Sequence, residues 1–153
     1  MSKIKFYLDT SVFGGCFDDI FEEDSKRIFK YVKAKKIQML ISQITYDEIL
    51  IAPNKVLNFF NSLDKESFSF IQTSKEIVDL AETYLSEKVI TKKSRNDALH
   101  VAHATAARAD AIVSWNFKHI VRFDRIKGFN KVNFDNGFGV IQIISPKEVF
   151  FDE

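Results

Sequence analysis

Four polar residues stand out because their positions in the chain suit a site at one edge of a parallel sheet. Asp9 directly follows the first apolar, β-rich segment, and Asn116 follows a later such segment by one or two residues. Glu48 lies about one turn into a helix after the second segment, and Asp97 lies in the first turn of an alanine-rich helix. Since the carboxyl ends of parallel strands share one edge, these four side chains are expected to face a common crevice.

Three of these side chains are carboxylates, and their chemistry points to a divalent cation. Mg²⁺ and Mn²⁺ prefer hard oxygen ligands, and Mg²⁺ keeps several of its waters. Carboxylates held close together raise one another's pKa, so such a cluster is costly unless a cation neutralises it. A bound cation can lower the pKa of a bound water, orient a phosphate and offset charge on the leaving oxygen. The set therefore predicts hydrolysis of a phosphodiester.

Each residue also has a simpler interpretation. Asp97 could complement the dipole of its helix, and Asp9 could begin a turn by bonding its own backbone. Glu48 could be a solvated helix residue, and Asn116 a turn or cap residue. The four in order indicate a site more strongly than any one of them does.

The elements that must position these residues alternate along the chain. Segments with the composition of buried strands are Ile4–Leu8, Ile37–Ile41, Phe68–Ile71, Ala111–Ser114 and Val140–Ile144. Helices are predicted over Asp24–Lys35, over Gln43–Ala52 with Ser42 as its cap, over Val56–Leu63, from Ser74 onward, and over Arg95–Ala109. Alternating strands and helices favour an α/β fold, with a parallel sheet covered by helices on both faces. The length suits a single domain over residues 1–153.

Composition limits the possible locations and partners. The chain has 22 Lys plus Arg against 21 Asp plus Glu, so its net charge of +1 names no partner, and a nucleic-acid binder would need locally clustered basic residues. Cys16 is the one cysteine, so no internal disulfide is possible. We find no signal peptide and no membrane span in the sequence, and a cytoplasmic protein without membrane contact is the expectation.

Four segments carry a family resemblance that covers essentially the whole chain. They are Tyr7–Val12 (YLDTSV), Thr45–Leu50 (TYDEIL), Asn96–Ala104 (NDALHVAHA) and Ile112–Ile120 (IVSWNFKHI). In this order and spacing they resemble the PIN-domain nuclease family, and within it the VapC-like toxins of toxin–antitoxin pairs. The resemblance implies a three-layer α/β/α fold with a five-stranded parallel sheet in the order 3-2-1-4-5. It also implies cleavage of single-stranded RNA with Mg²⁺ or Mn²⁺, a cognate antitoxin protein as partner, and a homodimer.

Carried over by position, Asp9, Glu48 and Asp97 match the family's acidic metal-site residues. Ser114 matches a supporting hydroxyl near the end of the fourth strand, and Thr10 or Ser11 is expected to have a similar role.

Asn116 stands where the family often has an acidic residue. Its carbonyl oxygen could still bind a metal, but it brings no charge, so weaker binding at any second metal position is expected. Asp124, farther along the chain, could compensate for the missing carboxylate.

Other polar and aromatic residues have two interpretations each. Lys93, Arg95, Lys118 and His119 flank the predicted crevice and could bind RNA phosphates, or they could be a solvated surface. Trp115 and Phe117 could stack on unpaired bases, although core packing is favoured. His100 and His103 are predicted to pack or cap their helix rather than bind zinc. An exposed aromatic patch, formed by Phe17 with Phe21 or by Phe59 with Phe60, could mark a dimer or antitoxin interface.

Two other functions fit parts of the pattern. The neutral Asn116 would suit a PIN-like module that binds RNA or protein with little catalysis. A phosphatase of the haloacid-dehalogenase type also places an aspartate after its first strand, but it requires a second aspartate where this chain has Ser11.

Overall fold

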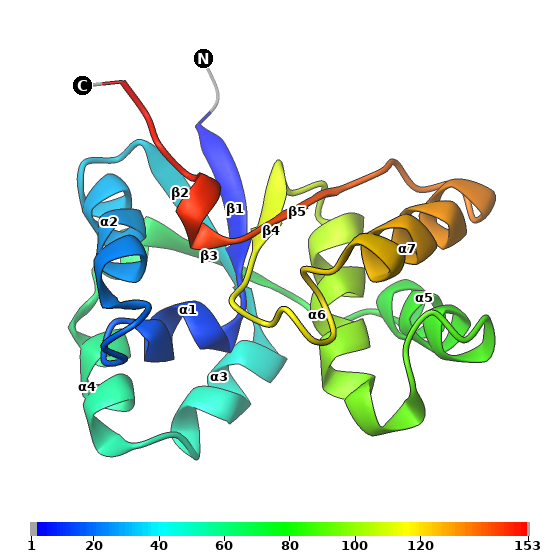
Figure 1. The fold of residues 1–153 in the computed structure, drawn as a ribbon, viewed down its shortest axis with the longest axis horizontal. Helices are drawn as coiled ribbons and strands as arrows, with labels where there is room; N and C mark the ends of the chain where they lie inside the picture. The colour runs from blue at the N-terminus through cyan, green and yellow to red at the C-terminus, as the bar shows by residue number, and fades with distance from the viewer. Residues whose placement is uncertain (1–2, 153) are drawn as a thin grey trace.

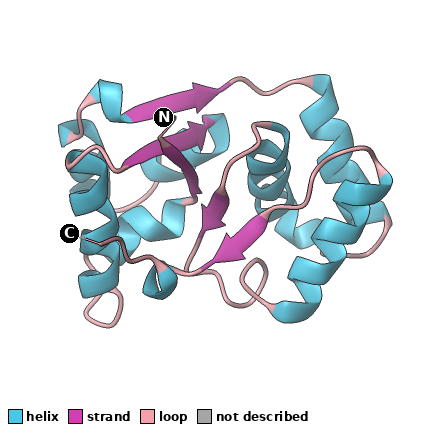
Figure 2. Ribbon diagram, turned by 90° about the horizontal axis from the view of Figure 1, so that it is seen from above, coloured by secondary structure: helices cyan, strands magenta, loops and turns pink. Residues whose placement is uncertain are grey.

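The computed structural model of the protein describes residues 3–152. Its strands form a five-stranded, all-parallel sheet in the predicted order β3-β2-β1-β4-β5. Helices lie on both sides of the sheet, which confirms the three-layer arrangement (Figures 1 and 2). The strands are β1 (Ile4–Leu8), β2 (Ile37–Ser42), β3 (Phe68–Ile71), β4 (Ala111–Val113) and β5 (Gln142–Ile144).

The pleat of the central strands divides the apolar side chains between two cores. Phe6 and Leu8 of β1 pack into one core, while Tyr7 between them packs into the other. Leu40 of β2 and Ile112 of β4 lie in the same core as Tyr7. Since successive side chains of a strand point to opposite faces, a strand segment covered on both faces must be apolar, as residues 6–8 of β1 and the whole of β4 are.

The first core lies beneath the helices α1 (Thr10–Gly15), α2 (Glu22–Lys33) and α4 (Asn54–Ser62). The second lies beneath α5 (Lys75–Ser86), α6 (Arg95–Ala106) and α7 (Phe123–Asp135). In Figure 1 these two groups of helices occupy the left and right sides of the sheet. Helix α3 (Gln43–Leu50) directly follows β2, and short 3-10 turns cover Lys65–Ser67, Lys92–Ser94 and Pro146–Glu148.

The tight packing at Gly15 joins α1 to the segment that follows β4. A Cβ at Gly15 would lie 2.3 Å from Ser25 Oγ and 2.7 Å from Trp115 Nε1. Trp115 donates from Nε1 to Ser25 Oγ at 2.7 Å, and its ring stacks on Phe21 with the centroids 4.1 Å apart. A glycine is therefore required here, and the core position favoured for Trp115 is confirmed.

Several predicted boundaries were wrong, and two helices were missed. The helix expected over Arg95–Ala109 ends at Ala106 and is followed by a left-handed residue, Arg108, with φ of 56°. The last strand begins at Gln142 rather than Val140, which is 71 % exposed. Helices α1 and α7 were not predicted.

The expected pairs of exposed aromatic residues are also wrong. Phe60 is buried in the first core, and Phe21 and Phe59 pack against that core. Phe17 is the exposed member, and its ring contacts Phe59 edge-on. Within the described residues, no helix combines the length and the apolar character needed to cross a bilayer.

Candidate active site

The acidic site lies where the order of the strands reverses. From the central β1 the chain proceeds to β2 and β3 on one side, and β4 and β5 then occupy the other side. Asp9 follows β1, and its backbone N–H donates to the carbonyl of Val113 in β4 at 3.3 Å. Ligands of parallel sheets bind outside the carboxyl ends of the strands at such a point.

Two serine hydroxyls fix the carboxylate of Asp9. Ser11 Oγ donates to Oδ1 at 2.5 Å, and Ser114 Oγ donates to Oδ2 at 2.6 Å. Each hydroxyl also accepts a backbone N–H, that of Trp115 at Ser11 and that of Asn116 at Ser114, both at 2.9 Å. Because each serine oxygen receives one hydrogen from the backbone, its own hydrogen is left to point at Asp9.

A negative charge on the carboxylate of Asp9 is energetically unfavourable, because the side chain is buried. The residue is 4 % exposed, and this burial raises the pKa of its carboxyl group. The nearby charge of Asp97 raises the pKa further, whereas His100 and the two serine hydroxyls lower it, and the net shift is upward. A cation bound here would offset both the burial and the repulsion between Asp9 and Asp97.

Asp97, in the first turn of α6, is supported by Asn116. Burial raises the pKa of Asp97, and the charge of Glu48 adds to the increase. A hydrogen bond from the Asn116 side chain acts in the opposite direction. Since Asn116 Oδ1 accepts the backbone N–H of His119 at 2.9 Å, its amide nitrogen is the group available to donate to Asp97. An aspartate at this position could not make that donation.

Glu48 is held through one carboxylate oxygen. Thr10 Oγ1 donates to Oε1 at 2.7 Å, and His100 Nε2 lies 2.6 Å from the same atom. Burial alone would raise the pKa of Glu48, but His100 and Thr10 hold it below its usual value. The hydroxyl expected at Thr10 thus lies on Glu48, while those of Ser11 and Ser114 lie on Asp9.

The carboxylate oxygens are ligands that Mg²⁺ and Mn²⁺ prefer, but the carboxylates do not form a complete set of metal ligands by themselves. No three His, Cys, Asp or Glu side chains within residues 3–152 are grouped closely enough to hold a metal ion. Mg²⁺ is commonly held by one or two carboxylates and keeps waters at its other positions. Asp9 and Asp97 suit that mode, because burial and the charge of a neighbouring carboxylate raise the pKa of each.

The basic residues predicted to flank the site differ in their exposure to solvent and in whether they already have an ion-pair partner. Lys93 and Lys118 are exposed, whereas Arg95 forms an ion pair with Glu82. Nδ1 of His119 is buried and has no hydrogen-bond partner among the described residues, and the charge of His119 lowers the pKa of Asp97. Phe117 is 46 % exposed and could contact a base.

Asp124 lies apart from these interactions because Arg122 holds both of its oxygens. Arg122 Nε donates to Oδ1 at 2.7 Å and Nη2 donates to Oδ2 at 2.8 Å, and both side chains are exposed. It therefore has a structural partner and does not compensate for the missing carboxylate at position 116.

His103 has the packing role that the sequence predicted, whereas His100 also contacts the site residue Glu48. His103 contacts the carbonyl of Leu99 at 2.6 Å and Thr73 Oγ1 at 2.8 Å, which is a packing role. The contact between His100 and Glu48 was missed. Its available signal was the spacing from Asp97, because residues three apart share a helix face.

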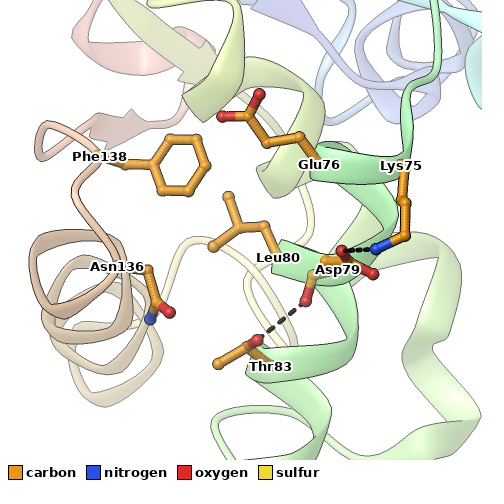
Figure 3. A pocket seen from close by; sticks show the side chains of 7 residues that line it. All are labelled: Lys75, Glu76, Asp79, Leu80, Thr83, Asn136 and Phe138. Carbon is orange, nitrogen blue, oxygen red and sulfur yellow. Dashed lines mark hydrogen bonds and ion pairs between the residues drawn. The ribbon is translucent and has the colours of Figure 1, made fainter.

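A cavity of about 420 Å³ lies between α5 and the segment after α7 (Figure 3). In it, Lys75 Nζ lies 2.8 Å from Asp79, and Thr83 donates to the Asp79 carbonyl at 2.9 Å. None of the predicted site residues is among those that line it: Lys75, Glu76, Asp79, Leu80, Thr83, Asn136 and Phe138.

Comparison with known proteins identifies the domain. The sequence profile of the PIN domain matches residues 5–118, a range that contains Asp9, Glu48, Asp97 and Asn116. No curated protein matches the chain.

Three solved structures share the fold. A toxin–antitoxin complex from Klebsiella pneumoniae is 22 % identical with a TM-score of 0.56, over 74 % of this chain and 88 % of that chain. VapBC2 from Rickettsia felis, bound to a DNA fragment from its promoter, is 17 % identical with a TM-score of 0.57, over 93 % and 98 %. FitAcB from Neisseria gonorrhoeae is 12 % identical with a TM-score of 0.58, over 94 % and 99 %. At these identities the likeness concerns the fold alone.

Proposed function

Because this chain belongs to the PIN-domain family, whose members are generally nucleases, we propose that it is a metal-dependent endoribonuclease acting on single-stranded RNA. The observation that carries the proposal is the buried carboxylate of Asp9, oriented by two serine hydroxyls at the strand switch point and close enough to Asp97 for their charges to interact. A purely structural aspartate at a turn would need neither the burial nor a second carboxylate nearby.

Asp9 and Asp97 would hold Mg²⁺ or Mn²⁺, with Glu48 bound directly or through water. The cation would supply an activated water and offset charge on the leaving oxygen. Ser11 and Ser114 keep both oxygens of Asp9 in place. The amide of Asn116 supports Asp97 with a hydrogen bond that lowers the pKa of its carboxyl group.

Single-stranded RNA would approach along the basic residues around this edge. Lys93 and Lys118 are exposed cations that can contact phosphates, and the half-buried His119 follows Lys118 in the chain. The exposed ring of Phe117 can stack on an unpaired base. Arg95 would have to leave Glu82 before it could bind a phosphate.

We further propose that the protein is the toxin of a toxin–antitoxin pair, active in the cytoplasm as a homodimer. The solved structures of similar fold are toxin–antitoxin complexes, which supports an antitoxin as partner. Exposed apolar side chains such as Ile20, Leu50 and Ile51, which are 77 %, 47 % and 87 % exposed, suit contacts with other chains. Induced expression should arrest growth, and co-expression of a neighbouring small gene should relieve the arrest; normal growth in both cases would exclude toxicity.

Cleavage of a mixed single-stranded RNA substrate tests the nuclease proposal. With Mn²⁺ or Mg²⁺ the protein should cleave, and a chelator should abolish cleavage. Asp9→Asn and Asp97→Asn should each reduce kcat/KM by about 100-fold or more, because each tenfold loss corresponds to about 1.4 kcal/mol of transition-state stabilisation. Asp124→Asn is the matched control, since it removes an exposed carboxylate paired with Arg122.

Metal-independent cleavage, or full activity in Asp9→Asn, would contradict the proposal. The second candidate is a module that binds RNA without hydrolysing it, which the neutral Asn116 favours. Tight RNA binding with no turnover under either metal would select that candidate.

A further inference from the structure

We propose that His100 and Tyr7 are positioning residues that hold Glu48 at the acidic site, an inference that rests on the proposed nuclease function. A continuous set of buried polar contacts runs from Glu48 through His100 and Tyr7 to the start of α3. Neither residue touches the substrate in this proposal. Both act by fixing where the Glu48 carboxylate lies.

The contacts around His100 are short and shielded from water. Its Nε2 lies 2.6 Å from Glu48 Oε1, and its Nδ1 lies 2.7 Å from the Tyr7 hydroxyl. His100 is 2 % exposed and Tyr7 is 0 % exposed. Both ring nitrogens of the histidine therefore have partners in a setting where an unpaired polar atom would be costly.

The hydrogen-bond directions are consistent along the whole set. A carboxylate only accepts, so Nε2 of His100 carries a hydrogen toward Glu48. Nδ1 shares a hydrogen bond with the Tyr7 hydroxyl, as the donor when the ring is protonated and as the acceptor when it is neutral. The Tyr7 hydroxyl completes the set with Ser42 Oγ at 2.8 Å or Thr45 Oγ1 at 3.3 Å, and either oxygen of these pairs can donate. Every donor in the set thus has an acceptor.

The set joins the three elements that carry the three carboxylates. Tyr7 lies in β1, two residues before Asp9, and His100 lies in α6, three residues after Asp97. Ser42 and Thr45 lie at the beginning of α3, the helix of Glu48. A bonded path between β1, α6 and α3 fixes the spacing of the carboxylates that the proposed function requires to act together.

Glu48 needs such support more than Asp9 does. It is half-buried on a helix surface, and its longer side chain has more rotamers to lose when a metal binds. Thr10 and His100 both contact Oε1, so Oε2 keeps its lone pairs for a metal or a metal-bound water. Orientation of a ligand by a second partner behind it is a general feature of metal sites.

Mn²⁺ affinity, measured by calorimetry without RNA, tests this inference together with RNA-cleavage kinetics. His100→Ala should weaken Mn²⁺ binding by about 10- to 100-fold, and Tyr7→Phe by a smaller factor. His100→Gln keeps an amide near the position of Nε2 and should recover part of the loss. In all three variants kcat should fall while KM for RNA stays within about twofold, because RNA contacts are untouched.

His103→Gln is the matched control for damage to α6. His103 is fully buried one turn further along the helix and bonds Thr73, away from the carboxylates. The His103→Gln variant should lower the unfolding temperature at least as much as His100→Gln does, and it should leave Mn²⁺ affinity unchanged. Thr73→Val breaks the same contact from its other end if His103→Gln does not fold.

The outcomes separate this inference from the proposed function. If wild type binds Mn²⁺ and Asp9→Asn does not, while His100→Ala and Tyr7→Phe bind as wild type does, the function stands and the positioning role is wrong. Equal loss of affinity in His103→Gln would also overturn it, because the effect would then be general destabilisation. If wild type neither binds Mn²⁺ nor cleaves RNA, the proposed function and this inference fall together.

Discussion

At the scale of single residues, Asp9 combines burial with hydrogen bonds to both of its carboxylate oxygens. Asp9 receives two hydroxyl donors, and each donor is oriented by a backbone N–H that reaches it from the segment after β4. Removal of one partner from such a buried arrangement leaves the other unsatisfied, which costs about 1–3 kcal/mol. The geometry of Asp9 is therefore determined before any ligand binds.

Asn116→Asp tests the interpretation of the neutral position. The change removes the amide donor to Asp97 and adds a charge beside it, so the metal-free protein should lose about 1–3 kcal/mol of stability. Mn²⁺ should bind roughly tenfold more tightly, because charge on the ligands raises affinity. Denaturant unfolding and calorimetric titration measure the two effects, with the exposed Asn61→Asp as control. Unchanged Mn²⁺ affinity would exclude a ligand role at position 116.

Cys16 gives a prediction about pH. Burial raises the pKa of its thiol from 9.0 to about 12. A pKa raised by folding stabilises the folded state below the unfolded pKa, and that contribution is lost as pH rises from 9.0 toward 12. The stability of wild type relative to Cys16→Ala should therefore fall with pH in that window. A difference that stays constant across it would contradict the buried, protonated thiol, as would rapid alkylation of the native protein near neutral pH.

At the scale of elements, α6 carries more of the site than its composition suggests. Its first turn presents Asp97, and its next turn presents His100 on the same face. The remaining length is nearly all buried and rich in alanine, which lets the helix pack closely against the sheet. The helix is thus both part of the core and the support of two site residues.

Gly15→Ala tests the contact that holds the segment after β4 against α1. The added methyl group would meet Ser25 Oγ and Trp115 Nε1, so we expect a loss of about 1–3 kcal/mol from overpacking. Gly14→Ala is the matched control, because a methyl group there would meet nothing within 4 Å and alanine favours a helix. Equal stability of the two variants in thermal unfolding would show that Gly15 is not required.

The two helices that could not be predicted from the sequence, α1 and α7, both contain residues that lower helix propensity. Helix α7 contains Gly128 and two asparagines, which lower helix propensity. Gly128 is nevertheless needed, because a Cβ there would lie 2.9 Å from Val89 Cγ1. The buried Asn133 donates to Thr105 Oγ1 at 3.3 Å, a contact between elements that local patterns do not reveal. Helix α1 has only six residues, two of them glycine.

At the scale of the whole molecule, the parallel sheet brings together residues from distant parts of the chain. Strand composition predicted the sheet and its two-sided covering, and the family resemblance supplied the order of the strands. The positions of Asp9, Glu48 and Asp97 relative to strand ends could be predicted for the same reason. The resemblance also supplied the hydroxyls of Thr10, Ser11 and Ser114, although not the carboxylate that each one contacts. The contacts of His100 with Glu48 and of Asn116 with Asp97 could not be predicted, because they are tertiary contacts.

Anomalous diffraction from crystals soaked in Mn²⁺ tests the central claim most directly. We predict one strong peak at the carboxyl edge of the sheet, within about 2.0–2.5 Å of a carboxylate oxygen of Asp9 and of Asp97. The same peak should be absent from Asp9→Asn crystals. A protein that cleaves RNA only with Mn²⁺, but whose crystals bind the ion elsewhere or not at all, would contradict this account of the site.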